Sequence, residues 1–206
     1  RQLAPPACRS MSPASTDAER PVGLLVLGAP PQLLSGAALM LQRCLQNTKI
    51  SGLWFEHPQW REPGVLAHWW QVWLNEPLPP ACAPWPGEVA QRLVGVDLCQ
   101  LSPTATVFAC LAQSLPVVTL PTAACCSRGT ASILAAIGLE SLVRDQPEEW
   151  LEAIGVLASD PDSYQQISSH LHRNLHQSLL FDTELLARDL LAAITMLRQP
   201  KIQLRS

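Results

Sequence analysis

Short apolar runs alternate along the chain with segments in which apolar residues recur at helical spacing. The runs are Gly23 to Gly28, Ser51 to Phe55, Val96 to Cys99 and Pro116 to Pro121. Runs of this length, fenced by glycine or proline, are typical of strands covered on both faces of a parallel sheet. Leu34 to Gln46 and Thr104 to Gln113 have helical spacing and lie between the runs. This order predicts an α/β fold, with a Rossmann-like parallel sheet and helices on both faces.

The last third of the chain predicts a run of helices. Ser127 to Ala136 begins one, which Gly138 closes as a C-cap. Asp145 and Glu148 have the spacing of a capping box, and Asp160 before Pro161 and Asp182 are the expected N-caps of two later helices. The helices after Asp145, Asp160 and Asp182 each carry apolar residues at helical spacing. These are Trp150, Leu151, Ile154 and Leu157; Tyr164, Ile167, Leu171 and Leu175; and Leu186, Leu190, Ile194 and Leu197.

The segment from Trp54 to Trp85 holds six of the seven tryptophans, interleaved with prolines. One interpretation is an aromatic surface for a sugar, a base or a partner protein. The other, which we favour because aromatic clusters are commonest in cores, is a helix around Val65 to Trp73 packed against the sheet edge. Val72 to Leu74 could instead form a third strand, and Gly87 to Leu93 is expected to be a short helix.

Composition narrows the function classes. The chain has 48% hydrophobic and 15% charged residues and a formal net charge of −3, which describes a folded globular chain with no general attraction to nucleic acid or acidic membranes. No apolar window has the length of a membrane span, and no signal peptide opens the sequence, so we expect a cytoplasmic protein. The seven cysteines include no C-x-x-C pair, and most are expected to be reduced core residues.

Domain organisation is expected to be simple. Residues 1–20 read as a linker or disordered end, residues 21–199 as one Rossmann-like domain and residues 200–206 as a tail. The sequence begins with Arg1 rather than Met, and we expect it to be a fragment of a longer protein.

Two loops are the expected functional region, because loops at the carboxyl ends of parallel strands face the ligand crevice. Ser102 to Thr106 follows the strand of Asp97, and Pro121 to Arg128 follows the next strand. The helix that starts at Thr104 would present free N–H groups and a positive dipole end to an anion. His172 and His176 lie four residues apart without a third ligand at a suitable spacing, so we expect no metal site there.

Several features occur together in an order that resembles a known family. They are Asp97 on its strand, the threonine-bearing loop, "LPVVTLP" from Leu115, Ser127-Arg128, Ala136 to Leu139, Asp160-Pro161 and Ser178 to Thr183. From about Val96 to Leu197 the chain resembles the C-terminal catalytic half of protein O-GlcNAc transferases of the SPINDLY type, which are GT-B glycosyltransferases. The resemblance implies a nucleotide-sugar-binding domain that ends in a run of helices.

The resemblance implies a donor site for a UDP-sugar, UDP-GlcNAc in this family, with no metal or cofactor. Its diphosphate would lie over Thr104, Ala105 and Thr106, with Gln32, Ser127 and Arg128 as further contacts. The family's His-Thr-Thr-Gly is changed at Thr104, Ala105 and Val107, and its ribose-binding Asp aligns with Ala109. Its Lys-x-x-His aligns with Pro86 and Val89, and no lysine lies between Arg20 and Lys49. These substitutions indicate a degenerate donor site.

The sequence is therefore consistent with two functions, one as part of an enzyme and one as a non-catalytic binding module. In the first, the chain is the donor-binding half of a protein O-linked glycosyltransferase, whose catalytic base and protein acceptor site belong to an N-terminal half, so that no catalytic residue is expected here. In the second, the fold persists as a non-catalytic interaction or scaffold module, with the tryptophan-rich segment as its contact surface.

Overall fold

The computed structural model describes residues 21–34, 36–86, 92–98 and 100–198. Its centre is a five-stranded parallel sheet with the strand order β3-β2-β1-β4-β5. The strands are β1 (Val22–Val26), β2 (Ile50–Phe55), β3 (Cys82–Pro84), β4 (Leu93–Asp97) and β5 (Val117–Thr119). The chain moves from β1 to one side of the sheet and returns at β4 to build the other side, so the switch in direction lies between β1 and β4.

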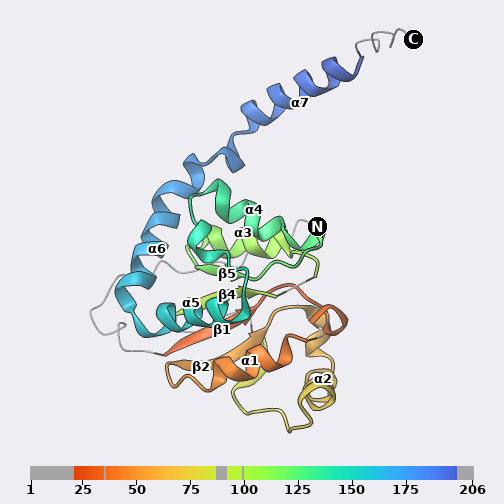
Figure 1. The fold of residues 1–206 in the computed structure, drawn as a ribbon, viewed down its shortest axis with the longest axis vertical. Coiled ribbons are helices and arrows are strands. Elements are labelled where there is room, and N and C mark those ends of the chain that lie inside the picture. Colours follow the sequence, from red (N-terminus) through yellow and green to blue (C-terminus); the bar gives the residue numbers. More distant parts are fainter. Residues whose placement is uncertain (1–20, 35, 87–91, 99, 199–206) are drawn as a thin grey trace.

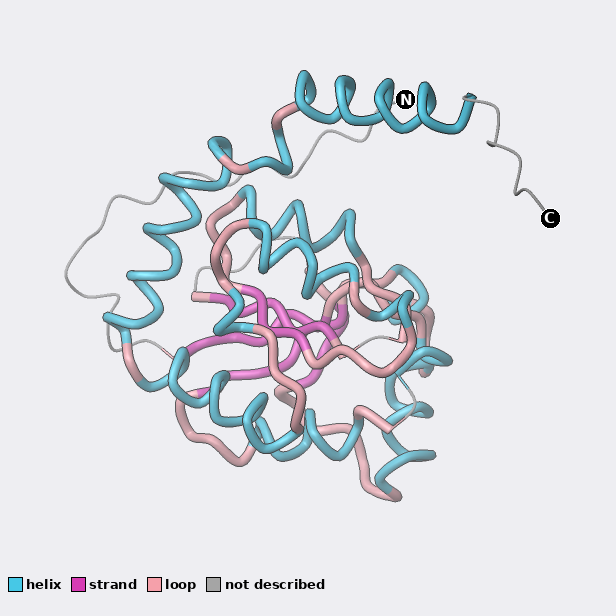
Figure 2. The backbone as a smooth tube through the Cα atoms, turned by 45° about the horizontal axis from the view of Figure 1, so that its top comes forward, coloured by secondary structure: helices cyan, strands magenta, loops and turns pink. Residues whose placement is uncertain are grey.

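Helices cover both faces of this sheet. The α-helices are α1 (Ala38–Leu45), α2 (Val65–Leu74), α3 (Thr104–Ala112), α4 (Gly129–Ala136), α5 (Pro147–Ser159), α6 (Pro161–Asn174) and α7 (Thr183–Arg198). Short 3₁₀ helices are η1 (Pro31–Leu34), η2 (Pro58–Arg61), η3 (Cys125–Ser127), η4 (Glu140–Leu142), η5 (Leu175–Gln177) and η6 (Leu179–Phe181). Figures 1 and 2 show α3 and α4 together on one side of the sheet and α1 and α5 on the other. The predicted α/β fold class is confirmed.

The strands are buried because both faces are covered. All five residues of β1 and of β4 are buried, and Leu24, Val94 and Val117 have no exposed surface. Burying a side chain of this size stabilises the fold by roughly 1.5–3 kcal/mol. The unbroken apolar runs of the sequence, without alternation of polar residues, follow from this double coverage.

Some predicted element boundaries are wrong. Val72 to Leu74 is the last turn of α2 and not a strand. The capping box of Asp145 and Glu148 does not form: α5 begins at Pro147, with Gln146 at the N-cap and no side-chain cap bond. Proline fits the first helical position, because it lacks the N–H that is unpaired there, and this moves the start of the helix beyond Asp145. Of the short helix expected at Gly87 to Leu93, residues 87–91 lie outside the described residues, and Leu93 belongs to β4.

Other predicted helix ends are confirmed. Gly138 has a φ of +73°, and Leu139 N–H donates to Leu134 O across 2.9 Å, as in a Schellman C-cap. Asp160 accepts from the N–H of Asp162 at 3.0 Å, and Asp182 accepts from the N–H of Leu185 at 2.8 Å, so both are N-caps.

The tryptophan-rich segment is mainly core. Trp60, Trp69 and Trp70 are buried, and the Trp60 ring lies 4.9 Å from Phe55 and 5.3 Å from Trp69, measured between ring centroids. Trp60 Nε1 donates to Ala29 O across 2.8 Å, which ties η2 to the loop after β1. The packing interpretation is therefore confirmed for these three rings.

The last helix does not bury its apolar stripe. α7 projects from the rest of the molecule in Figure 1, and Leu186 and Leu190 are 68% and 59% exposed. No helix in the described part of the chain is long and apolar enough to cross a membrane.

Candidate functional site

The candidate site lies at the carboxyl edge of the sheet, around the switch between β1 and β4. Ligands of open α/β sheets bind in the crevice at such a switch. The loops after β1, β2, β4 and β5 all emerge at this edge because the strands are parallel. Their contacts with one another define the geometry of the site.

The loop after β1 is held between β2 and α3. Gly28 has a φ of +50°, and a Cβ atom built there would lie 2.2 Å from Cβ of Pro103, so only glycine fits against the residue that precedes α3. On its other side, the Gly28 N–H donates to Oε2 of Glu56 across 3.1 Å. The loop, the end of β2 and the start of α3 are therefore in direct contact.

The first turn of α3 is open to solvent. The helix follows Pro103, has no side-chain cap, and carries Thr104 and Ala105 on its exposed surface and Thr106 partly buried. The first N–H groups of an α-helix have no partner within the helix, and they carry its positive dipole end. Val107, buried in the next position, fixes this turn against the core.

The loop between β5 and α4 is organised around Ser127. This side chain has no exposed surface, and its Oγ accepts from the Thr122 N–H at 2.9 Å and donates to Ala124 O at 2.8 Å. The hydroxyl of Thr122 also donates to it across 2.9 Å. These bonds use the hydroxyl of Ser127 within its own loop, whereas Arg128 is exposed and its side chain forms no hydrogen bond or ion pair within the described residues.

This second loop is joined to the start of α3. Ser102 N–H donates to Cys126 O at 2.9 Å, and Ser102 Oγ donates to Ser127 O at 2.7 Å. A Cβ on Gly129 would lie 2.8 Å from Cγ2 of Thr104, so the first turns of α3 and α4 pack closely. The structure thus brings Thr104, Ala105 and Thr106 beside the loop of Ser127 and Arg128. Gln32 is exposed on η1, farther along the loop of Gly28.

Glu56 was not among the site residues predicted from the sequence. It follows β2 directly, is partly buried, and is oriented by the Gly28 N–H. An acidic residue immediately after a predicted strand was the signal that could have found it. Asp97, at the end of β4, is 1% exposed and accepts from Thr119 Oγ1 at 3.2 Å, which links the ends of two neighbouring strands.

Thiol chemistry divides the described cysteines into two groups. Burial raises the pKa of Cys44, Cys82 and Cys110 to about 12, and the charge of Glu56 adds to the effect on the pKa of Cys110. Cys125 and Cys126 are exposed and unpaired by disulfides. His172 and His176 are exposed, and no group of three or more metal-ligating side chains occurs within the described ranges.

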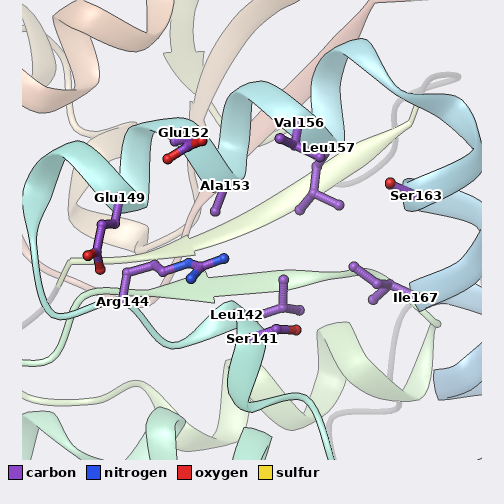
Figure 3. A pocket seen from close by; sticks show the side chains of 10 residues that line it. All are labelled: Ser141, Leu142, Arg144, Glu149, Glu152, Ala153, Val156, Leu157, Ser163 and Ile167. Carbon is purple, nitrogen blue, oxygen red and sulfur yellow. The ribbon is translucent and has the colours of Figure 1, made fainter.

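Two cavities lie beyond the predicted contact residues. One, of about 460 Å³, is a surface pocket lined by residues of η4, α5 and α6, and Figure 3 shows Arg144 reaching across it below α5. The other, of about 380 Å³, lies between the first turn of α1 and the ends of β4 and β5, and is lined by Met40, Leu98, Thr122 and Asp145 among others. Neither of these two cavities is lined by any of the six predicted donor contacts.

Comparison with known proteins places this geometry in a family. Residues 86–190, about half of the 206 residues, match the family model described as glycosyl transferase family 41. The chain belongs to this family. No curated protein matches the chain. The match spans β4, α3, β5 and α4, which are the elements that carry most of the candidate site. The resemblance to O-GlcNAc transferases, expected from the sequence, is confirmed at the level of the family and fold.

Two solved structures are similar to this family 41 chain. A point mutant of the Thermobaculum terrenum O-GlcNAc transferase is 22% identical, with a TM-score of 0.59 over 77% of this chain and 32% of that chain. The glycotransferase of kitacinnamycin is 18% identical, with a TM-score of 0.46 over 82% of this chain and 42% of that chain. The chain thus spans about a third of the length of the first structure. At this identity the first structure supports the fold, and the contacts of the donor stay predictions.

Proposed function

We propose that the chain is the donor-binding half of a protein O-linked glycosyltransferase. Its proposed ligand is a UDP-sugar, and UDP-GlcNAc is the first candidate. The observation that carries this proposal is the first turn of α3. It is exposed, it lacks a side-chain cap, and it lies at the strand switch of a domain that belongs to glycosyl transferase family 41. In the proposed complex the diphosphate lies over Thr104, Ala105 and Thr106.

The chemistry of this turn suits a diphosphate without a metal ion. Unpaired N–H groups and the positive end of the helix dipole stabilise an anion, and threonine hydroxyls donate further hydrogen bonds. Arg128, exposed at the start of α4, supplies a cation at the neighbouring helix end, and Gln32 supplies an amide from η1. Ser127 contributes by holding its loop in place, because its hydroxyl is buried and already bonded.

We propose that sugar transfer requires a second half that this sequence does not include. The chain corresponds to 32% of the structurally similar O-GlcNAc transferase chain. The catalytic base and the protein acceptor would then lie on the other half, and this half would supply the donor. The cytoplasmic location expected from the sequence stays a prediction.

Isothermal titration with UDP and with UDP-GlcNAc tests the proposal. Saturable binding in the micromolar range supports it. Ala105→Glu is the informative variant, because a carboxylate in the first turn stabilises the helix by about 0.3–1 kcal/mol yet repels the diphosphate. We expect a folded protein with at least a roughly tenfold weaker affinity, which corresponds to about 1.4 kcal/mol.

Thr183→Glu is the matched control, since it adds the same charge to the exposed first turn of α7. It should leave nucleotide affinity unchanged. The rival function, a non-catalytic scaffold module, predicts that neither ligand binds the unmodified chain at millimolar concentration. If the unmodified chain and Ala105→Glu bind the nucleotide with equal affinity, the diphosphate does not bind at the first turn of α3.

A further inference from the structure

Glu56 is an acidic side chain that lies beside the proposed donor site and has no assigned role. It follows the last residue of β2 and is only partly exposed. Its carboxylate contacts the Gly28 loop, and that loop contacts Pro103 at the start of α3. The carboxylate is therefore one backbone loop away from the turn over which the diphosphate is proposed to bind.

The two oxygens of this carboxylate are in different situations. Oε2 accepts the Gly28 N–H at 3.1 Å, which fixes the orientation of the group. Within the described residues Oε1 has no partner, and it is not among the buried atoms that lack one, so it is open to solvent. One oxygen is thus anchored and the other is available to a ligand.

The chemistry of this oxygen restricts what it can bind. An ionised carboxylate only accepts hydrogen bonds, and it repels a phosphate. Its charge also adds to the effect of burial in raising the pKa of the Cys110 thiol on α3. The part of a nucleotide sugar that donates hydrogen bonds close to the diphosphate is a hydroxyl-bearing ring, either the ribose or the pyranose.

The position of Glu56 resembles that of an acidic residue in dinucleotide-binding sheets. In those sheets, whose strand order is 3-2-1-4-5-6, an Asp or Glu roughly 20 residues beyond the glycine-rich turn hydrogen-bonds the ribose 2′-hydroxyl of NAD. The sheet here has the order β3-β2-β1-β4-β5, and Glu56 stands at the end of β2. We propose that Glu56 accepts a hydrogen bond from a hydroxyl of the donor's vicinal diol, and that it thereby selects donors that carry this diol.

This inference rests on the proposed function, and the experiment separates the two. The full chain and Glu56→Gln are titrated with UDP, with 2′-deoxy-UDP and with UDP-GlcNAc. The substituted amide oxygen can still accept the Gly28 N–H, so the loop stays in place. Removal of the negative charge acts on all three diphosphates alike, so the ratios of affinities isolate the hydroxyl contact. Glu62→Gln, an exposed acid six residues farther on, is the matched charge control.

The expected result is that the unmodified chain and Glu62→Gln bind UDP roughly tenfold tighter than 2′-deoxy-UDP, since a hydrogen bond to a charged group has about this effect. Glu56→Gln should lose most of that ratio, which assigns the contact to the ribose. If it loses instead the ratio of UDP-GlcNAc to UDP, the contact is to the pyranose. If Glu56→Gln has the same UDP to 2′-deoxy-UDP ratio and the same UDP-GlcNAc to UDP ratio as the unmodified chain, this inference is wrong and the proposed function still stands. Absence of UDP binding to the unmodified chain would overturn both.

Discussion

Replacement of Ser127 by alanine tests whether this buried hydroxyl holds the loop between β5 and α4. The substitution keeps Cβ and removes only Oγ. The Thr122 N–H, which donates to Oγ at 2.9 Å, loses its partner. Ala124 O loses the bond that it accepts from Oγ at 2.8 Å but keeps the one from the Ser127 N–H at 3.1 Å. Because Ser127 has no exposed surface, water cannot take the place of the missing oxygen without opening the loop.

The size of the effect follows from these two backbone bonds. A hydrogen bond contributes about 0.5–1.5 kcal/mol net, and an unpaired buried partner adds a further cost. The hydroxyl of Thr122 is exposed and can turn to water, so we leave it out of the sum. We expect the free energy of unfolding to fall by about 2 kcal/mol, which for a chain of this size lowers Tm by roughly 4–8 °C.

Urea unfolding followed by circular dichroism measures this change. Ser132→Ala is the matched control, because its Oγ donates to Arg128 O at 3.1 Å from an exposed position, and its loss should cost less than about 0.5 kcal/mol. If Ser127→Ala is no more destabilising than this control, the bonds of Ser127 do not hold the loop, and a direct contact of Ser127 with the ligand becomes the better interpretation.

Two further predictions concern the core and the switch. Gly28→Ala should destabilise the fold by about 2–4 kcal/mol, because Gly28 has a positive φ and a Cβ there would lie 2.2 Å from Cβ of Pro103. Gly36→Ala is the control: Gly36 has a φ of +86° but a Cβ there would meet no atom within 4 Å, so the substitution should cost only about 1–2 kcal/mol. Equal free energies of unfolding for the two variants would contradict the contact between Gly28 and Pro103. The pKa of about 12 of Cys44, Cys82 and Cys110 lies above the ordinary value of 9.0, so the folded state keeps these thiols protonated. Their contribution to stability is complete below pH 9 and falls by up to about 1.4 kcal/mol per pH unit per thiol between pH 9 and 12. Unfolding measured across this range should lose part of that slope in Cys44→Ala, and an unchanged slope would contradict it.

The sequence was sufficient for most of the fold, because both faces of the sheet are covered. Unbroken apolar runs such as Leu24 to Leu27 have few alternatives to a buried parallel strand. β3 was missed, since Cys82–Pro84 has only three residues, includes a proline and lies at the sheet edge, where its pairing with β2 decides its structure. The start of α5 was misplaced for a local reason, because two residues suited to helix starts, Asp145 and Pro147, competed for one end.

The candidate site was partly accessible to sequence reasoning. Thr104 to Thr106 could be placed at the carboxyl edge, because a strand and a helix start fix that position whatever the rest of the chain does. The role of Glu56 could not be deduced, since it depends on a hydrogen bond to Gly28 and on the packing of Gly28 against Pro103, far apart in sequence. The closed bonding of Ser127 is likewise visible only once its loop is folded.

The most direct test of the donor site is a titration of the ¹⁵N-labelled chain with UDP, followed through its backbone amide signals. Ala105 and Thr106 lie in the first turn of a helix without a side-chain cap, so their amides report a bound diphosphate directly. The Thr104 N–H already donates to Ser102 O across 2.9 Å, and its signal reports a change in that bond. The account predicts saturable shifts of these amides and of Gly28 at micromolar UDP. Unmoved signals at millimolar UDP, or shifts confined to the cavity of Arg144 while α3 stays unchanged, would contradict it.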